Sequence, residues 1–280
     1  NLIKINNKTR DKNIAVYQDK KTKIIFLEKF ITNANYYNLV KYAKIRQKNN
    51  KKIIFTKTKN KLIKSHKLDD DLRRANLFNK YCKNKDVLDF GCGWGGFLSK
   101  VKKLKSYNAV ELRNECVDFI KRNNKKINIF KNINDFNKSF DLITMFHVLE
   151  HIPYQVKTLQ LLNKKIKKGG KIIIEVPHAE DFLILQEELK EFKNFTFWSE
   201  HLILHTYKSL KSILLKSGFK NINIQYYQRY NFSNHLGWFL KRKPGGHNFY
   251  KEAVSDELNS SYCENLKKLG QTDTLIAIAK

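Results

Sequence analysis

A glycine-rich run flanked by two acidic residues is the part of the sequence best suited to hold a charged cofactor. Residues 87–97 read VLDFGCGWGGF, so three glycines at G-x-G-x-G spacing follow Asp89. Glycine lets the backbone turn sharply from strand to helix and approach a ligand without a Cβ atom in the way. Glu111, 22 residues after Asp89, ends the next apolar segment, where a carboxylate accepts hydrogen bonds from both hydroxyls of a ribose. The pattern predicts a site for a ribose-bearing cofactor.

Histidines are the side chains here that could exchange a proton near neutral pH. His147 follows an apolar segment, at the carboxyl edge of the expected sheet, where ligands bind in such folds. His151 lies four residues further on, so both rings could share one helical face. Each histidine could instead be a hydrogen-bonded structural residue. The candidates are His147, His151, His201, His205 and His247.

Strand-like and helical patterns alternate over most of the chain, and these elements must position the glycine run and the histidines. Short apolar segments predict strands at 86–90, 108–111, 127–129, 140–145, 171–176, 221–227 and 275–279. Apolar residues at helical spacing predict helices over 97–104, 116–121, 156–166 and 210–214. Gly169-Gly170 and Gly218 are expected to stop the last two of these helices. The alternation predicts a parallel sheet with helices on both faces.

Two segments fall outside this alternation. Residues 1–70 are expected to be a basic N-terminal extension, with hairpin strands at 14–17 and 24–27, a helix over 36–48 and a polar loop at 48–61. The main domain is expected to cover 71–280. Within it, 228–273 is a long connection that we interpret as a lid, with a helix over 255–269. Its KPGGH run at 243–247 combines a stiff proline, two permissive glycines and cationic side chains, as closing loops do.

Four motifs in order resemble the class I S-adenosylmethionine-dependent methyltransferases. Residues 87–95 match V-L-D-x-G-x-G-x-G, Glu111 is the acid that ends the second strand, and FDLITMFHVLEHI at 140–152 and KGGKIIIEVP at 168–177 are the third and fourth. SEHL at 199–202, SL at 209–210 and GF at 218–219 resemble bacterial methyltransferases acting on sugars and surface-polysaccharide precursors. The resemblance implies an α/β fold: a doubly wound, mostly parallel seven-stranded sheet of the Rossmann-like methyltransferase type, with an N-terminal extension and a late insertion.

The resemblance also implies roles for individual side chains. S-adenosyl-L-methionine is the expected cofactor, and the expected reaction is methyl transfer to a hydroxyl of a sugar, nucleotide sugar or polysaccharide precursor. The expected cofactor-binding residues are Asp89, Gly91, Gly93 and Gly95 at the methionine and ribose end, Glu111 at the ribose hydroxyls, Asn132 and Ile133 near the adenine, and Phe146. The expected catalytic residues are His201, His147, His151 and Glu200, and those expected to bind the acceptor are Lys243 and His247. No metal ligands are expected.

The net charge of +29 raises the question of a polyanionic partner. Residues 1–85 carry 24 basic and 6 acidic side chains, so much of the excess lies there. The chain has 47 Lys but 8 Arg, alongside 30 Asn. Nucleic-acid binders usually rely on Arg, so we interpret the charge chiefly as compositional bias, and a small-molecule acceptor that carries negative charge fits it as well. An RNA methyltransferase, a sugar C-methyltransferase and a non-catalytic cofactor-binding module stay open as alternatives.

The four cysteines, Cys82, Cys92, Cys116 and Cys263, form no C-x-x-C pair and no zinc-finger spacing. Scattered unpaired cysteines are typical of a reducing compartment, so we expect a cytoplasmic location. No apolar run approaches the roughly 18 residues that a membrane-spanning helix needs. The sequence carries no signal for an oligomeric state.

Overall fold

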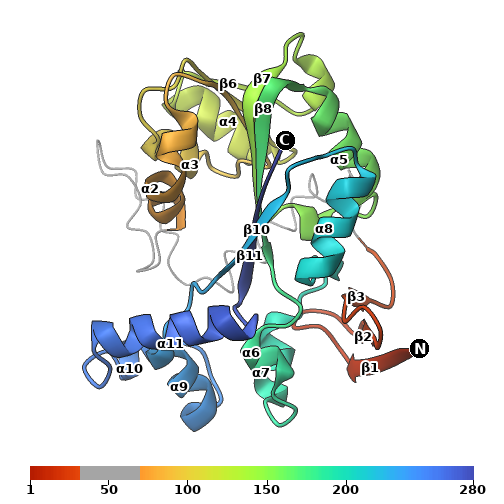
Figure 1. Ribbon diagram of the computed structural model, residues 1–280, viewed down its shortest axis with the longest axis vertical. Helices are drawn as coiled ribbons and strands as arrows, with labels where there is room; N and C mark the ends of the chain where they lie inside the picture. Colours follow the sequence, from red (N-terminus) through yellow and green to blue (C-terminus); the bar gives the residue numbers. More distant parts are fainter. Residues whose placement is uncertain (32–69) are drawn as a thin grey trace. The chain divides into compact units, whose positions relative to one another are not determined.

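Two β-sheets organise the residues that the structure describes, which are 1–31 and 70–280 of a computed structural model (Figure 1). The larger sheet has seven strands in the order β10-β11-β8-β7-β4-β5-β6. Parallel pairs join β4 to β5 and β7, and β5 to β6, whereas β11 is antiparallel to both β8 and β10. The predicted mostly parallel seven-stranded sheet is confirmed. Its strands are β4 (Asp86–Phe90), β5 (Ser106–Val110), β6 (Ile127–Phe130), β7 (Phe140–Phe146), β8 (Ile166–Pro177), β10 (Asn223–Tyr227) and β11 (Thr274–Ala279).

The chain divides into two compact units, which are described separately below. The first unit contains residues 1–31, 145–165 and 171–280. The described part of the second unit contains 70–144 and 166–170. The glycine run and Glu111 lie in the second unit, and His147, His151 and His201 lie in the first.

The second unit brings the ends of three parallel strands to one edge. Its β4 is buried over most of its length, as expected for a strand covered on both faces. Asp89 on β4 lies in register with Ala109 on β5 and Thr144 on β7. Its helices are α2 (Asp70–Cys82), α3 (Gly96–Lys100) and α4 (Asn114–Asn123), and α2 packs on α3. The glycine run therefore leaves β4 at a buried sheet edge.

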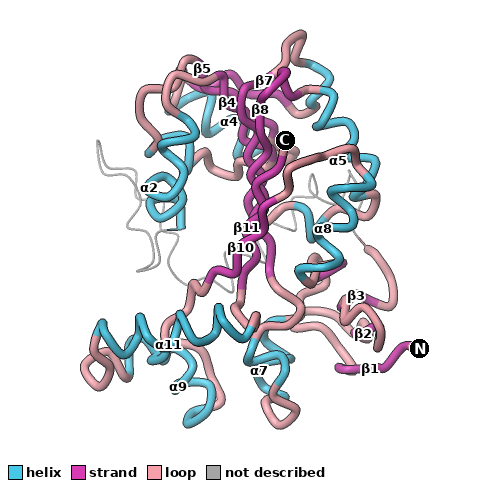
Figure 2. Tube along the Cα trace, in the orientation of Figure 1, coloured by secondary structure: helices cyan, strands magenta, loops and turns pink. Residues whose placement is uncertain are grey.

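The first unit contains β10 and β11, which run beside β8 (Figure 2). Because β11 is antiparallel to both, β8 and β10 point the same way, and the chain leaves β10 at the edge where β8 ends. Two helices pack on each other in this unit, α5 (Gln155–Lys164) and α8 (Tyr207–Lys216). The connection after β10 forms α9 (Phe232–Lys241), α10 (Gly246–Phe249) and α11 (Asp256–Leu269). The helix predicted at 255–269 is confirmed, with Ser255 as its N-cap.

The N-terminal residues form a second, four-stranded sheet within the first unit. Its order is β1 (Leu2–Asn6), β2 (Val16–Asp19), β3 (Ile25–Leu27) and β9 (Ile203–Leu204). The predicted hairpin is confirmed as the antiparallel β2–β3 pair. Asp19 closes its turn, because its Oδ1 accepts hydrogen bonds from the backbone N–H groups of Lys21 and Thr22. Strand β9 was not predicted, since two residues are too few to give a pattern.

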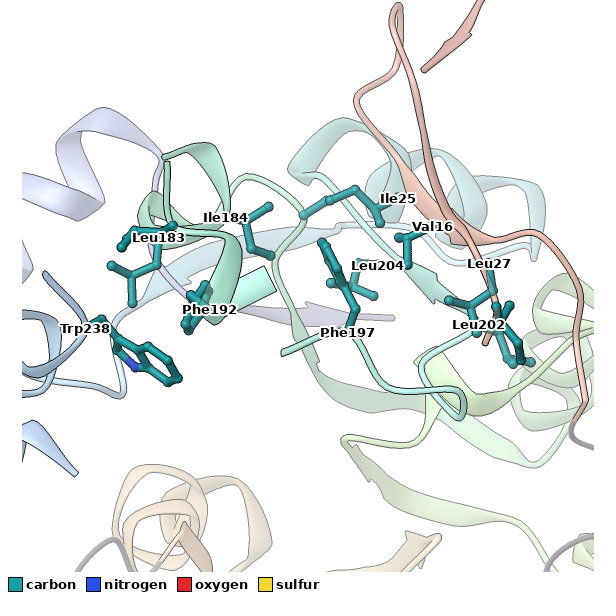
Figure 3. Packing of buried hydrophobic residues seen from close by; sticks show 13 residues of the cluster. Val16, Ile25, Leu27, Leu183, Ile184, Phe192, Phe197, Leu202, Leu204 and Trp238 are labelled. Carbon is teal, nitrogen blue, oxygen red and sulfur yellow. The ribbon is translucent and has the colours of Figure 1, made fainter. Parts of the chain in front are cut away.

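A single apolar cluster joins this small sheet to the later part of the first unit (Figure 3). Val16, Ile25 and Leu27 from the hairpin are buried with side chains from α6 (Phe182–Leu185), α7 (Lys190–Thr196) and α9. The rings of Phe192 and Trp238 meet edge to face with centroids 5.0 Å apart. The N-terminal strands are thus part of a shared core.

Two predicted helices end earlier than expected. The helix predicted to run to Gly169 ends at Lys164, and β8 begins at Ile166. Gly169 has a φ of 79°, and a Cβ atom on Gly170 would lie 3.0 Å from the backbone oxygen of Asp141. Gly169 therefore provides a left-handed position within β8, and Gly170 leaves room for Ile166, Lys167 and Asp141 on β7, so the predicted helix stop at these glycines is wrong. Helix α3 ends at Lys100 because the next residue is extended.

The predicted helix at 36–48 and the loop at 48–61 lie outside the described residues. Of the helices in residues 1–31 and 70–280, none combines the length and the apolar character needed to cross a bilayer.

Removing one ring from the shared core should separate core packing from surface effects. We expect Phe197→Ala, at a site 1% exposed, to lower the free energy of unfolding by about 3–5 kcal/mol, through lost apolar burial and the cavity left behind. Leu215→Ala, at a 56% exposed position of α8, should change it by no more than about 0.5 kcal/mol. Urea unfolding followed by circular dichroism measures both. Equal effects would contradict the packing described here.

Candidate cofactor and acid–base sites

The glycine run folds as a tight loop at the carboxyl end of β4. Gly91, Gly93 and Gly95 have φ values of 78°, 58° and 75°, in the left-handed region that residues with a Cβ atom rarely adopt. The backbone N–H of Gly91 donates to the carbonyl oxygen of Val110 at 2.8 Å, so the loop is anchored to the end of β5. All three predicted glycines therefore have a conformational reason to be glycine.

Glu111 lies directly after β5 and is bonded into that loop. Its Oε2 accepts a hydrogen bond from the backbone N–H of Gly93 at 2.8 Å. Its Oε1 accepts one from the backbone N–H of Arg113 at 3.0 Å. The Arg113 guanidinium also reaches both oxygens, at 3.1 and 3.2 Å. Burial by itself raises the pKa of Glu111, but the charge and hydrogen bonds of Arg113 outweigh it and hold that pKa below its usual range.

This geometry fits the ribose of the expected cofactor. A carboxylate offers about four lone-pair positions. The two backbone N–H groups hold Glu111 in place from its own loop, and the remaining positions face the Arg113 guanidinium. Ribose hydroxyls bound to Glu111, as predicted, would compete with the Arg113 guanidinium for those positions. Arg113 was not predicted from the sequence.

Asp89 is buried next to the glycine loop and is 3% exposed. Its Oδ1 accepts a hydrogen bond from the Thr144 hydroxyl at 2.8 Å. Burial raises the pKa of Asp89 to about 7, and the hydrogen bond from Thr144 only partly opposes this. A cationic group of a ligand would favour the ionised form. The site thus combines a fixed carboxylate, Glu111, with one whose charge depends on its surroundings.

The residues predicted near the adenine lie after β6, in the same unit. Asn132 caps the short 3-10 helix Ile133–Asp135, and its side-chain oxygen accepts from the backbone N–H of Asn134 at 2.9 Å. Ile133 is buried. Phe146, at the end of β7, belongs to the first unit and is also buried. An adenine contact at Asn132 and Ile133 and a cofactor contact at Phe146 stay predictions.

In the first unit, His147 bridges two fully buried carboxylates. Its Nδ1 lies 3.1 Å from Glu150 Oε1, and its Nε2 lies 3.2 Å from Glu175 Oε1. Burial alone lowers the pKa of His147, but the hydrogen bonds to these carboxylates outweigh it and raise the pKa. Arg229 Nη1 also lies 3.2 Å from Nε2. With a raised pKa, the His147 ring is protonated and donates to both carboxylates. Arg229 is then a neighbour of like charge, and the negative charges of Glu150 and Glu175 offset the repulsion.

His151 and His201 also lie close to Glu150. The two rings meet edge to face with centroids 5.0 Å apart. His151 Nε2 is 3.8 Å from Glu150 Oε1. The segment that carries His201 is held there because the backbone N–H of Leu202 donates to the carbonyl oxygen of Glu150 at 2.8 Å. The structure therefore brings His147, His151 and His201 together around one carboxylate.

The other candidates lie apart from this cluster or serve the core. His205 is buried between Gln155 Oε1, at 2.8 Å, and Ser209 Oγ, at 3.0 Å, and burial lowers its pKa to about 4. His205 is therefore a hydrogen-bonded structural histidine, the alternative that the sequence left open for each candidate. His247 Nδ1 lies 3.3 Å from Asn234 Nδ2, and the Lys243 ammonium is 5.3 Å from the centre of the Phe249 ring. Glu200, which directly precedes His201 in the sequence, is buried.

Several residues around His147 were not predicted from the sequence. Glu175 reaches His147 from β8, and Arg229 reaches it from the residues after β10. Glu150 belongs to the motif at 140–152, but no role was predicted for its side chain. They are brought together by sheet pairing over distances that no local spacing encodes. The Glu175 position inside an apolar strand was the available clue, because a buried charge needs a partner.

Comparison with known proteins agrees with this reading of the fold. The family model described as "Methyltransferase domain" matches residues 60–224. The chain therefore belongs to the methyltransferase domain family, the class that the glycine loop, Glu111 and the seven-stranded sheet predicted. A SAM-dependent methyltransferase from Archaeoglobus fulgidus has a similar fold, with a TM-score of 0.50 at 24% identity, over 75% of this chain and 91% of that one.

Curated relatives agree on the class and differ in what their names say they act on. A mitochondrial ubiquinone biosynthesis O-methyltransferase of Candida albicans is 31% identical over 121 residues, covering 38% of this chain and 36% of that protein. A tRNA U34 carboxymethyltransferase of Aliarcobacter butzleri is 27% identical over 166 residues, covering 54% and 53%. The chain spans about half or less of the length of these relatives. The predicted likeness to sugar methyltransferases finds no counterpart in these names.

Loss of the Glu111 charge should weaken cofactor binding selectively. We expect Glu111→Gln to bind S-adenosylmethionine about 10- to 150-fold more weakly, the equivalent of the roughly 1.5–3 kcal/mol of a hydrogen bond to a charged group. Titration calorimetry measures it. Arg113→Ala is the matched control, because it removes the competing guanidinium and leaves the carboxylate. Its affinity for S-adenosylmethionine should fall by less than about 10-fold. Unchanged binding in Glu111→Gln would refute the ribose assignment.

The buried Asp89 should make stability depend on pH. Its pKa of about 7 in the folded chain exceeds that of an unfolded Asp, so its contribution to stability is present at low pH and is lost as pH rises towards 7. Asp89→Asn cannot ionise. We therefore expect the free energy of unfolding of the variant, relative to that of the natural chain, to increase by about 1.4 kcal/mol for each pH unit between about 5 and 7. Urea unfolding at several pH values tests this, and a difference that stays constant with pH would contradict it.

Proposed function

We propose that this chain transfers the methyl group of S-adenosylmethionine to an oxygen of a small-molecule acceptor. The observation that carries the proposal is Glu111, a buried carboxylate fixed by the N–H of Gly93 in a loop of three left-handed glycines. The cofactor supplies an already activated methyl group on a sulfonium. The C–O bond forms as the C–S bond breaks, and the acceptor hydroxyl loses its proton.

The chain's contribution is to bind, orient and accept a proton. Glu111 would hold the ribose, and Asp89 and the glycine loop the methionine end. His147 is poorly suited to be the base, because both ring nitrogens contact carboxylates. We therefore assign His147 a positioning role and propose His201 or His151 as the group that takes the proton. Glu200 directly precedes His201 in the sequence.

The finer proposal is an acceptor that is a sugar, a nucleotide sugar or a related precursor. It is supported by the SEHL, SL and GF segments at 199–202, 209–210 and 218–219. The connection containing α9, α10 and α11 leaves the carboxyl edge of β10 and carries Lys243 and His247. These two side chains would suit an anionic group of the acceptor. We propose that this connection acts as the lid.

RNA is a second candidate acceptor. The net charge of +29 favours it, as does the relative named a tRNA U34 carboxymethyltransferase. Protein–RNA affinity falls steeply with salt because bound counterions are released, whereas binding of a small acceptor does so far less.

Transfer of a radiolabelled methyl group separates these candidates. The full chain is incubated with labelled S-adenosylmethionine and either a panel of sugars, sugar phosphates and nucleotide sugars, or total RNA. We expect label in the small molecules, with His201→Gln lowering kcat while the Kd for the cofactor stays within a few-fold, because this residue is proposed to take the proton of the acceptor and not to hold the cofactor. Label in RNA, with activity falling steeply between low and moderate salt, would replace the small-molecule proposal. No transfer to either, with intact cofactor binding, would leave a binding module.

A further inference from the structure

A cluster of three potential metal ligands surrounds the buried end of Glu150 in the first unit. Glu150, His151 and His201 each offer one ligand atom, and these atoms all lie within 4.8 Å of one another. His151 and His201 come from segments 50 residues apart, which the hydrogen bond from Leu202 to Glu150 holds together. No motif spacing links them, so the sequence gave no reason to expect metal ligands.

A second, independent observation points to a ligand at this place. The Glu150 side chain is fully buried, and its Oε2 has no hydrogen-bond partner among the described residues. Its Oε1 is occupied by His147. A buried carboxylate oxygen without a partner costs free energy, so such atoms in folded proteins call for an unseen partner.

The donor set defines the class of ion. Two imidazoles and one carboxylate suit zinc and neighbouring first-row transition metals, whereas magnesium and calcium prefer sets made of oxygen. Tetrahedral ligands about 2.1 Å from an ion lie about 3.4 Å apart, so the three atoms, which lie within 4.8 Å of one another, need to approach by up to about 1.4 Å. The histidines are only partly buried, which leaves room for that adjustment and for a further ligand.

The surroundings resemble those of protein metal sites. Residues that ligate a metal are themselves held by hydrogen bonds from a second layer. Here His147 Nδ1 contacts Oε1 of Glu150, and His147 is in turn fixed by Glu175 and by its backbone N–H, which donates to the Glu175 carbonyl oxygen at 2.8 Å. His147 also has a φ of 51°, an uncommon backbone conformation that this network maintains.

We propose that Glu150, His151 and His201 form a binding site for one divalent transition-metal ion of the zinc class. With three protein ligands, the ion keeps a position for an oxygen of water or of a bound molecule. The proposed methyl transfer does not require this ion, so the two proposals can fail separately. If the ion is present, His151 and His201 would activate an oxygen through it, in place of accepting a proton themselves.

Cobalt titration of the full chain tests the site without an activity assay. The protein is stripped with a chelator, which is then removed, and Co²⁺ is added while visible absorption is followed; Zn²⁺ is then added in competition. We expect saturation at one equivalent and loss of the cobalt spectrum on adding zinc. Loss of an outer partner of a metal ligand weakens binding about 10- to 100-fold, so His201→Gln and His151→Gln, which remove ligands, should each weaken it by at least about 100-fold.

His247→Gln is the matched control, because it removes a partly buried histidine from α10, outside the cluster, and should leave the stoichiometry and affinity unchanged. Glu150→Gln could fail to fold, since it leaves His147 without one of its carboxylates, so the two histidine variants carry the test. Their circular dichroism spectra are compared with that of the natural chain. Absence of saturable binding by the natural chain, or undiminished binding in both histidine variants, would overturn the proposal.

Discussion

Buried carboxylates in or after strands of the large sheet are the constraint on which both candidate sites depend. An ionised carboxylate without partners costs several kcal/mol when it leaves water. Glu111 meets that cost with two backbone N–H groups and Arg113, which fixes the glycine loop. Glu150 and Glu175 meet it by sharing His147. In each unit the need to compensate a buried charge therefore dictates where the neighbouring backbone runs.

The two groups of carboxylates differ in a way that suits different tasks. Glu111 is tied to its own loop and remains ionised, as its lowered pKa indicates. Burial and the His147 contact act in opposite directions on Glu150, and the charges of His147, His151 and His201 prevail, holding its pKa at about 2. Asp89 accepts a hydrogen bond from the neutral Thr144 hydroxyl, and burial raises its pKa. Of Glu111, Glu150 and Asp89, only Asp89 is poised to change charge near neutral pH, so a cationic ligand would set its state.

Sequence reasoning recovered what is encoded locally. The strand at 86–90, the loop glycines and the helix at 255–269 were predicted because alternation, left-handed turns and capping act over a few residues. Arg113, Glu175 and Arg229 were missed, because their roles arise from pairings set by the folded chain. The Gly169-Gly170 pair was misread because two glycines indicate a special backbone without saying which one. Here they lie in a strand, where Gly169 has a φ of 79° and Gly170 lies close to Ile166, Lys167 and the sequence-distant Asp141.

The N-terminal residues show how far such distant pairing reaches. Asp11 accepts hydrogen bonds from the backbone N–H and hydroxyl of Ser199, at 3.0 and 2.6 Å. The Arg10 guanidinium lies 4.9 Å from the centre of the Trp198 ring. These contacts fix the segment just before His201, and the β3–β9 pair fixes the segment just after it. Residues that read in the sequence as a basic extension thus hold in place one of the three histidines gathered around Glu150, and the position of that ring depends on the first strands of the chain.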